Sequence, residues 1–98
     1  MLEIKRKVGQ SFVIDRRVIV TVNSFRENPP AVTFSVHRST GLRRVLGVPV
    51  GSSGVVQTLS GAVRIHVRFI DRREVAVGIE APRSIDIQRP ERESRLPS

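Results

Sequence analysis

Hydrophobic residues recur at every second position along most of this chain. In residues 18–22, three valines would share one face of a strand, with Ile19 and Thr21 on the other face. A period of two is typical of strands with one buried face, and β-branched side chains favour that conformation. The same alternation returns in residues 32–36, 63–69, 75–79 and 85–87.

Turn-forming residues separate these stretches at short intervals. They are Asp15–Arg17, Glu27–Pro30, Ser52–Gly54, Ser60–Gly61, Asp71–Arg73 and Ala81–Arg83. Many short strands with this spacing predict an all-β barrel or sandwich. In the strand of residues 63–69, the alternation assigns one shared face to Val63, Ile65, Val67 and Phe69. We also predict a flexible turn, not a phosphate-binding loop, at Gly51–Gly54, because no lysine follows it.

The length of 98 residues fits one compact domain, here predicted over residues 1–89. Residues 90–98 form a polar tail bracketed by prolines, which fits either a short helix or a disordered end. The two halves of the domain resemble each other. Residues 18–22 align with 63–67, and 32–36 align with 75–79 if two residues near Pro29 are extra. This predicts degenerate repeats over 1–44 and 45–89, although any two alternating strands look alike.

Charge points to the class of partner. The chain carries 17 Lys and Arg against 9 Asp and Glu, a net charge of +8. Most of these cations are arginines, whose planar guanidinium suits phosphates and guanine edges. A small basic domain has nucleic acid as its default partner, with an acidic protein or an anionic membrane as alternatives. A solvated basic surface without a partner is the remaining interpretation.

Several kinds of chemistry lack their residues. The chain has no cysteine, so disulfides, thiolate metal sites and thiol catalysis are excluded. His37 and His66 have no second ligand at metal-binding spacing, and no catalytic triad can be read. We therefore expect a non-enzyme without a metal or cofactor. Charged residues interrupt the N-terminal apolar positions, and no run of about 18 apolar residues occurs. We expect a cytoplasmic protein without a membrane segment.

Two segments carry a family resemblance. Met1–Gln10 reads Met-Leu-Glu-Ile-Lys-Arg-Lys-Val-Gly-Gln, and residues 75–89 contain Gly-Ile-Glu-Ala-Pro-Arg followed by Arg89. Together they resemble the CsrA/RsmA family of small bacterial translational regulators, over about half of the chain. Members of that family are shorter. The chain would therefore hold either an insertion over roughly residues 15–60 or two fused copies, and the internal similarity favours fusion.

The resemblance implies a fold, a ligand and a site. The fold would be an intertwined β-strand barrel or sandwich, either a fused single-chain pseudo-dimer or a strand-swapped homodimer. The family places the first strand of one copy beside the last strand of the other. There it binds GGA elements in hairpin loops of mRNA leaders or small regulatory RNAs. Carried over by position, the RNA-binding residues are Ile4, Lys5, Arg6, Lys7, Ile87 and Arg89.

The residues themselves fit that assignment. Side chains two positions apart share a strand face, so Ile4 would point with Arg6, and Ile87 with Arg89. An arginine can donate to the O6 and N7 of guanine, while Lys5 and Lys7 on the other face would attract phosphate. Alternatively, the arginines are solvated charges that protect a sheet edge.

A second site would use Arg43 and Arg44 at the junction of the repeats. We expect it to be degraded, because residues 35–39 lack the Gly-Ile-Glu-Ala-Pro sequence of residues 78–82. Asp71–Arg73 replaces a glycine-rich turn of the family, and the tail shortens the helix with which some relatives bind a flagellar assembly antagonist. The alternative function is a protein-interaction module that keeps the fold without binding RNA.

Overall fold

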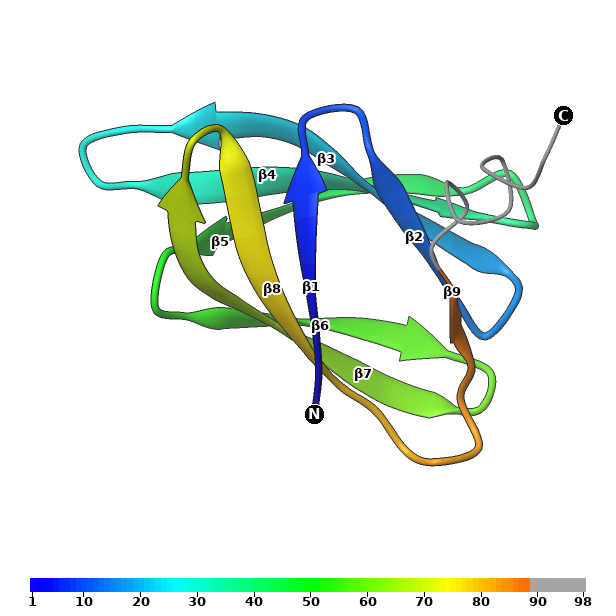
Figure 1. Cartoon of the computed structure of the whole chain (residues 1–98). Coiled ribbons are helices and arrows are strands. Elements are labelled where there is room, and N and C mark those ends of the chain that lie inside the picture. The colour runs from blue at the N-terminus through cyan, green and yellow to red at the C-terminus, as the bar shows by residue number, and fades with distance from the viewer. Residues whose placement is uncertain (89–98) are drawn as a thin grey trace, which may run out of the picture.

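The computed structural model describes residues 1–88, which form nine β-strands and no helix (Figure 1). The strands are β1 (Leu2–Lys7), β2 (Ser11–Ile14), β3 (Val18–Arg26), β4 (Ala31–Arg38), β5 (Arg43–Pro49), β6 (Ser53–Thr58), β7 (Gly61–Asp71), β8 (Glu74–Glu80) and β9 (Ile87–Gln88). They pair in two antiparallel sheets. The all-β class predicted from the alternation is confirmed.

Each sheet combines strands from both ends of the chain. One has the order β1-β8-β7-β6 and the other has the order β5-β4-β3-β2-β9. The N-terminal strand β1 therefore pairs with β8, and β9 pairs with β2. In Figure 1, β1 (blue) lies against β8 (yellow), although more than 60 residues separate them in the sequence. These long-range pairs join the two halves of the molecule.

The two halves share a strand order and a bulge. The meander β2-β3-β4 corresponds to β6-β7-β8, and β1 and β5 each precede one of them. Register shifts occur between Val22 and Ser24 on β3 and between Val67 and Phe69 on β7. The two bulges lie 45 residues apart in the sequence (67 − 22 and 69 − 24). This is also the offset that aligns residues 18–22 with residues 63–67.

The correspondence ends between β4 and β5. Arg38 N–H donates to the Leu42 carbonyl and Gly41 N–H donates to the Arg38 carbonyl, so a tight turn joins these strands. No counterpart of β9 fits in this connection. Within residues 1–88, β2 is therefore covered by β9, whereas no strand pairs with the outer edge of β6.

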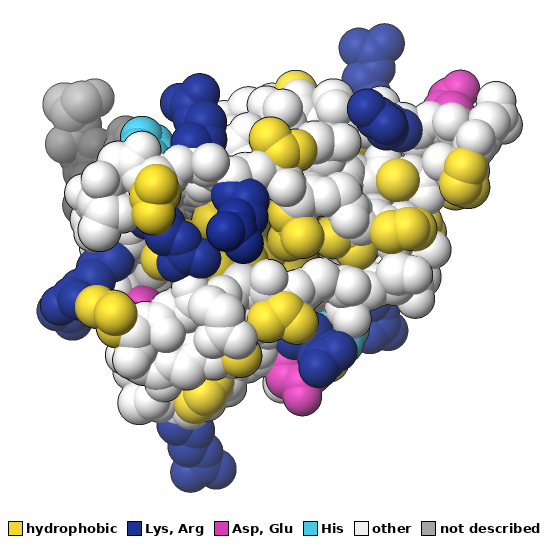
Figure 2. Space-filling view, turned by 180° about the vertical axis from the view of Figure 1, so that it is seen from behind, with side chains coloured by type: hydrophobic (Ala, Val, Ile, Leu, Met, Phe, Trp, Pro, Cys, Tyr) yellow, Lys and Arg dark blue, Asp and Glu magenta, His cyan; other side chains and the backbone are white. Residues whose placement is uncertain are grey.

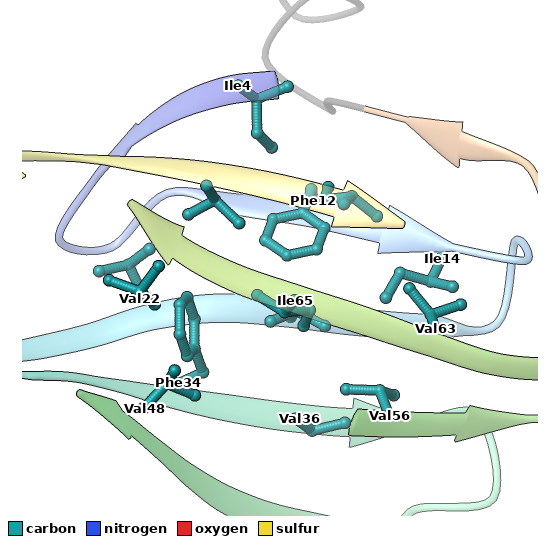
Figure 3. Close-up of a cluster of buried hydrophobic side chains, with 14 of the residues drawn as sticks. Ile4, Phe12, Ile14, Val22, Phe34, Val36, Val48, Val56, Val63 and Ile65 are labelled. Atoms are coloured by element: carbon teal, nitrogen blue, oxygen red, sulfur yellow. The ribbon is translucent and has the colours of Figure 1, made fainter. Parts of the chain in front are cut away.

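Side chains from both sheets fill the space between them (Figure 3). Phe12 and Phe34 are fully buried, and every second residue of β3 and β7 joins them up to the bulges. Burial of each such side chain contributes about 1.5–3 kcal/mol, which makes this aliphatic cluster the main stabilising element. Val63, Ile65 and Val67 face inward as predicted.

Two expectations about local structure are wrong. Phe69 faces outward, because the bulge after Val67 inserts one residue and reverses the alternation. Gly54 lies inside β6 rather than in a turn, and the turn falls at Val50–Ser52. A Cβ at Gly54 would lie 3.0 Å from side-chain atoms of Leu46 and Val48, so a larger residue here would require these β5 side chains to shift.

Candidate nucleic-acid interface

The first-strand residues lie on a sheet edge. β1 pairs with β8 alone among the described strands, with Ile4 opposite Val77 and Arg6 opposite Val75. Alternation turns Ile4 and Arg6 inward, where they are 3% and 7% exposed. Lys5 and Lys7 point outward and are exposed. The predicted sharing of faces is present, but the inner face is buried.

Arg6 ties β1 to β2. Its Nε donates to the Lys5 carbonyl at 2.6 Å, and its Nη1 donates to the Ser11 carbonyl at 3.2 Å. Arg6 pairs with Val75, and the residue that corresponds to Val75 in the other half is Val32. Val32 pairs with Val48, which is buried and therefore takes the place of Arg6 in that half. A guanidinium thus occupies a place where the other half has an aliphatic side chain. Contact between Arg6 and a base would require the side chain to leave these carbonyls.

The C-terminal strand meets β2 and not β1. Ile87 lies opposite Ile14, and the Asp15 N–H donates to the Asp86 carbonyl at 2.8 Å. Ile87 is half-buried and packs against the core cluster that also contains Ile4. β1 and β9 are edge strands of different sheets, and β2 connects them, since it follows β1 after a short turn. Arg89 lies outside the described residues.

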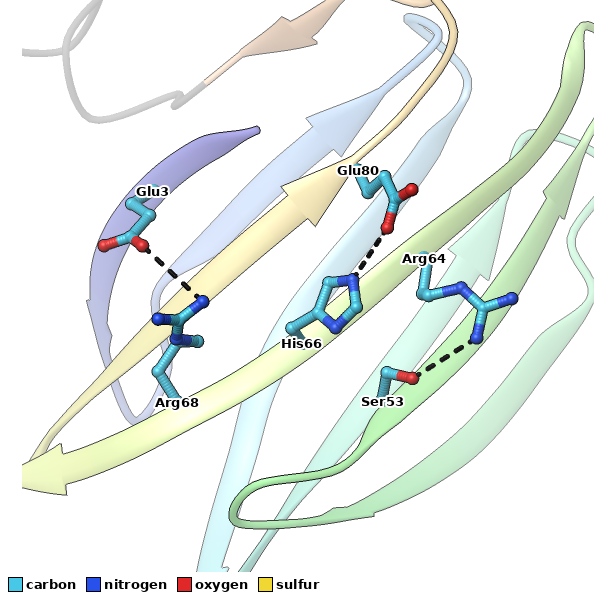
Figure 4. A network of polar contacts seen from close by, with 6 residues as sticks. All are labelled: Glu3, Ser53, Arg64, His66, Arg68 and Glu80. Atoms are coloured by element: carbon cyan, nitrogen blue, oxygen red, sulfur yellow. Dashed lines mark hydrogen bonds and ion pairs between the residues drawn. The ribbon is translucent and has the colours of Figure 1, made fainter.

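The outer face of the β1-β8-β7-β6 sheet carries a group of polar contacts (Figure 4). Arg68 Nη1 lies 3.9 Å from Glu3 Oε2, His66 Nε2 lies 3.0 Å from Glu80 Oε1, and Arg64 donates to Ser53 Oγ at 3.5 Å. The hydrogen bond from His66 lowers the pKa of Glu80, and the charges of His66 and Arg64 add to this. The face is held in a defined arrangement of charges.

An aromatic ring on this face escaped the sequence interpretation. The register places Lys5, Ala76 and Phe69 in one row across β1, β8 and β7. Phe69 is 49% exposed, whereas Phe12 and Phe34 are fully buried. It borders a hollow of about 140 Å³ lined by Lys5, Phe69, Asp71, Arg72, Glu74 and Ala76. An exposed ring beside cations suits base stacking with phosphate attraction. The sequence gives no direct signal for this, because the bulge is invisible in the alternation.

The junction strand forms a separate basic region. Arg43 and Arg44 are exposed on β5, beside the exposed Leu42 and Val45. Arg38 reaches across from β4, and its Nη1 donates to the Gln57 carbonyl of β6 at 2.5 Å. Figure 2 shows basic side chains around a hollow with a hydrophobic floor on the face seen from behind. The structure does not bring Arg43 and Arg44 near β1.

Among residues 1–88, no three acidic or histidine side chains gather as metal ligands would. No helix suited to crossing a membrane occurs in the same part of the chain. Comparisons with protein-family models, curated proteins and solved structures find no match for this sequence.

Proposed function

We propose that this chain is a divergent, fused member of the CsrA/RsmA family that binds GGA elements in RNA hairpin loops. The exchange of β1 and β9 between the halves is the observation that supports this most. Each terminal strand lies on the meander of the other half, as two fused copies with intertwined strands would require. Binding to an mRNA leader would alter translation or message stability in the cytoplasm, without a catalytic step.

Different residues around β1 would make different kinds of contact with RNA. Lys5 and Lys7 would attract phosphates, and so would Arg72 at the tip of the β7-β8 hairpin. Phe69 would stack on a base exposed by the loop, since single-stranded RNA presents its rings to aromatic side chains. Ile87 would supply an aliphatic contact at the other end. Arg89 enters the proposal from the resemblance alone.

Arg6 takes a changed role in this proposal. Its bonds to the Lys5 and Ser11 carbonyls hold β1 in place, so it would position Lys5 and Lys7. Direct readout of guanine would fall to Arg89, for which each lost base contact would cost about 1–3 kcal/mol.

The test is a titration with a hairpin that displays GGA and with a hairpin whose loop is scrambled, at one fixed salt concentration. We expect the GGA hairpin to bind about tenfold or more tightly. Lys5→Ala should weaken both complexes and reduce the salt dependence by about one unit of slope. Arg26→Ala, an exposed change on the other sheet, is the matched control. Equal binding of both hairpins would contradict the proposal.

A second candidate is a protein-interaction module. The commitment of Arg6 to backbone carbonyls favours it, because an essential base-reading side chain would then be occupied. In that case the protein would retard neither hairpin in a gel at physiological salt, but it would bind an acidic polypeptide.

A further inference from the structure

The outer edge of β6 pairs with no other described strand. Thr58 pairs with Gly61 across the turn to β7, and the Val67 N–H donates to the Ser52 carbonyl at the other end. Because paired and unpaired residues alternate along an antiparallel strand, Ser53, Val55 and Gln57 turn their N–H and C=O groups away from β7. The Gln57 carbonyl accepts its bond from Arg38 on this outer side.

The β6 strand itself lacks the charges, proline and shortness that protect the other described edges, although the Arg38 side chain contacts it. Charged residues occupy most of β1, β5 carries Arg43, Arg44 and Pro49, and β9 is two residues long. Lysine, arginine, proline and shortness are the usual means by which proteins prevent sheets from pairing at their edges. β6 reads Ser-Gly-Val-Val-Gln-Thr over six residues, without a charge or a proline.

The internal correspondence shows what such an edge accepts. β2, the counterpart of β6, pairs on its outer side with β9. The β4-β5 turn leaves no residues for an equivalent strand, so no described strand covers this edge, and the contact there is the Arg38 side chain on the Gln57 carbonyl. The vacant place has the geometry of one added antiparallel strand.

We propose that β6 pairs with β6 of a second copy, centred on Val55, so that two four-stranded sheets become one continuous sheet. In this register Val55 faces Val55, and Ser53 faces Gln57 of the other copy. On the outer face, the cross-strand side-chain pairs are therefore one pair of β-branched valines and two Ser53–Gln57 pairs whose side chains can form hydrogen bonds. On the inner side Gly54 faces Val56, which sets the smallest side chain against a larger one. The strand is complementary to itself, as a two-fold interface requires.

Charge selects the second copy over an acidic peptide. The strand itself carries no cation, and Arg38, which reaches its outer edge, already donates to the Gln57 carbonyl. Each copy has a net charge of +8, so the two copies repel, and screening by salt should strengthen their association. An acidic peptide or RNA would instead bind more weakly as salt rises. The inference does not depend on the proposed RNA function.

The experiment is sedimentation of the full chain over a range of concentrations at low and high salt. Val55→Pro removes the outward N–H without touching the bonds to β7, and Val55 is 45% exposed, so this edge position tolerates proline. Val55→Thr keeps the N–H and the β-branched shape and is the matched control. Thermal melting of both variants shows whether the fold is intact.

We expect a weak dimer of the wild type that tightens with salt, is preserved in Val55→Thr, and weakens about tenfold or more in Val55→Pro. Three results would overturn the proposal: a wild type that stays monomeric at every concentration, a dimer that salt dissociates, or a Val55→Pro variant that dimerises as tightly as the wild type.

Discussion

At the scale of single residues, alternation identified which side chains share a face but not what surrounds that face. Ile4 and Arg6 point together as predicted, yet into the interior, because the inner side of β1 faces the core between the two sheets. Phe69 was predicted to share a face with Val63, Ile65 and Val67, and it lies on the opposite, exposed face. Both discrepancies arise from long-range geometry that no local pattern contains.

The buried guanidinium of Arg6 leads to a prediction about stability. Arg6→Ala would leave the Lys5 and Ser11 carbonyls without this donor and should lower the free energy of unfolding by about 1–3 kcal/mol. Lys5→Ala, one position along on the exposed face, should change it by no more than about 0.5 kcal/mol. Urea unfolding of both variants measures this. A loss in Arg6→Ala no larger than in Lys5→Ala would show that the two hydrogen bonds contribute little.

The exposed ring of Phe69 leads to a prediction about RNA. Phe69→Ala should weaken hairpin binding by about 1–3 kcal/mol while leaving the salt dependence unchanged, because stacking neutralises no phosphate. Ile19→Ala, which removes a similarly exposed apolar side chain from β3, should bind as the wild type does. If RNA binds the wild type and Phe69→Ala equally, the stacking role is wrong while the RNA function stands.

The Glu80–His66 contact leads to a prediction about pH. The pKa of Glu80 is lowered in the folded chain, so its carboxylate stabilises the fold above the ordinary glutamate pKa of 4.5. That contribution is lost as the pH falls through the lower folded pKa. Glu80→Gln should therefore be less stable than the wild type near pH 6, and the difference should be smaller at a pH below the folded pKa of Glu80. Melting curves at both pH values measure this, and a constant difference would exclude the carboxylate as its source.

At the scale of elements, most strands could be predicted because one face of each is buried. The alternating stretches 18–22, 32–36 and 75–79 lie inside β3, β4 and β8. Register could not be predicted, because the bulges that reset it depend on the partner strand. The β7-β8 turn was expected at Asp71–Arg73, and there Arg72 and Arg73 adopt φ values of 52° and 65°.

Those two arginines are poor residues for their backbone. A two-residue hairpin turn with both φ values positive favours Asn-Gly, and a side chain in the left-handed region costs about 1–2 kcal/mol. The double substitution Arg72→Asn and Arg73→Gly should therefore stabilise the fold and raise Tm by several degrees. A differential scan measures this. The same substitution should weaken RNA binding if Arg72 contacts phosphate, and a lower Tm would show that the arginines stabilise the turn.

At the scale of the whole molecule, the internal similarity predicted two related halves, and the structure gives them one strand order and one bulge position. The family resemblance led us to expect the first strand beside the last strand, which contains Ile87, whereas β1 pairs with β8 and β9 pairs with β2. Periodicity says nothing about which strands meet. The lack of a described strand on the outer edge of β6 could not be foreseen, because it follows from the tight β4-β5 turn. Arg89, the last predicted RNA contact, lies beyond the described residues.

The most direct test of the account is a disulfide between β1 and β8 within one chain. Lys7 lies opposite Glu74, and the chain has no cysteine of its own. The double substitution Lys7→Cys and Glu74→Cys should, after mild oxidation, give a compact band of single-chain mass on a denaturing non-reducing gel. Lys7→Cys with Arg26→Cys, on the other sheet, should not close. A ladder of covalently linked chains would show that the strand is exchanged between molecules, and an open single chain would show that β1 does not lie on β8.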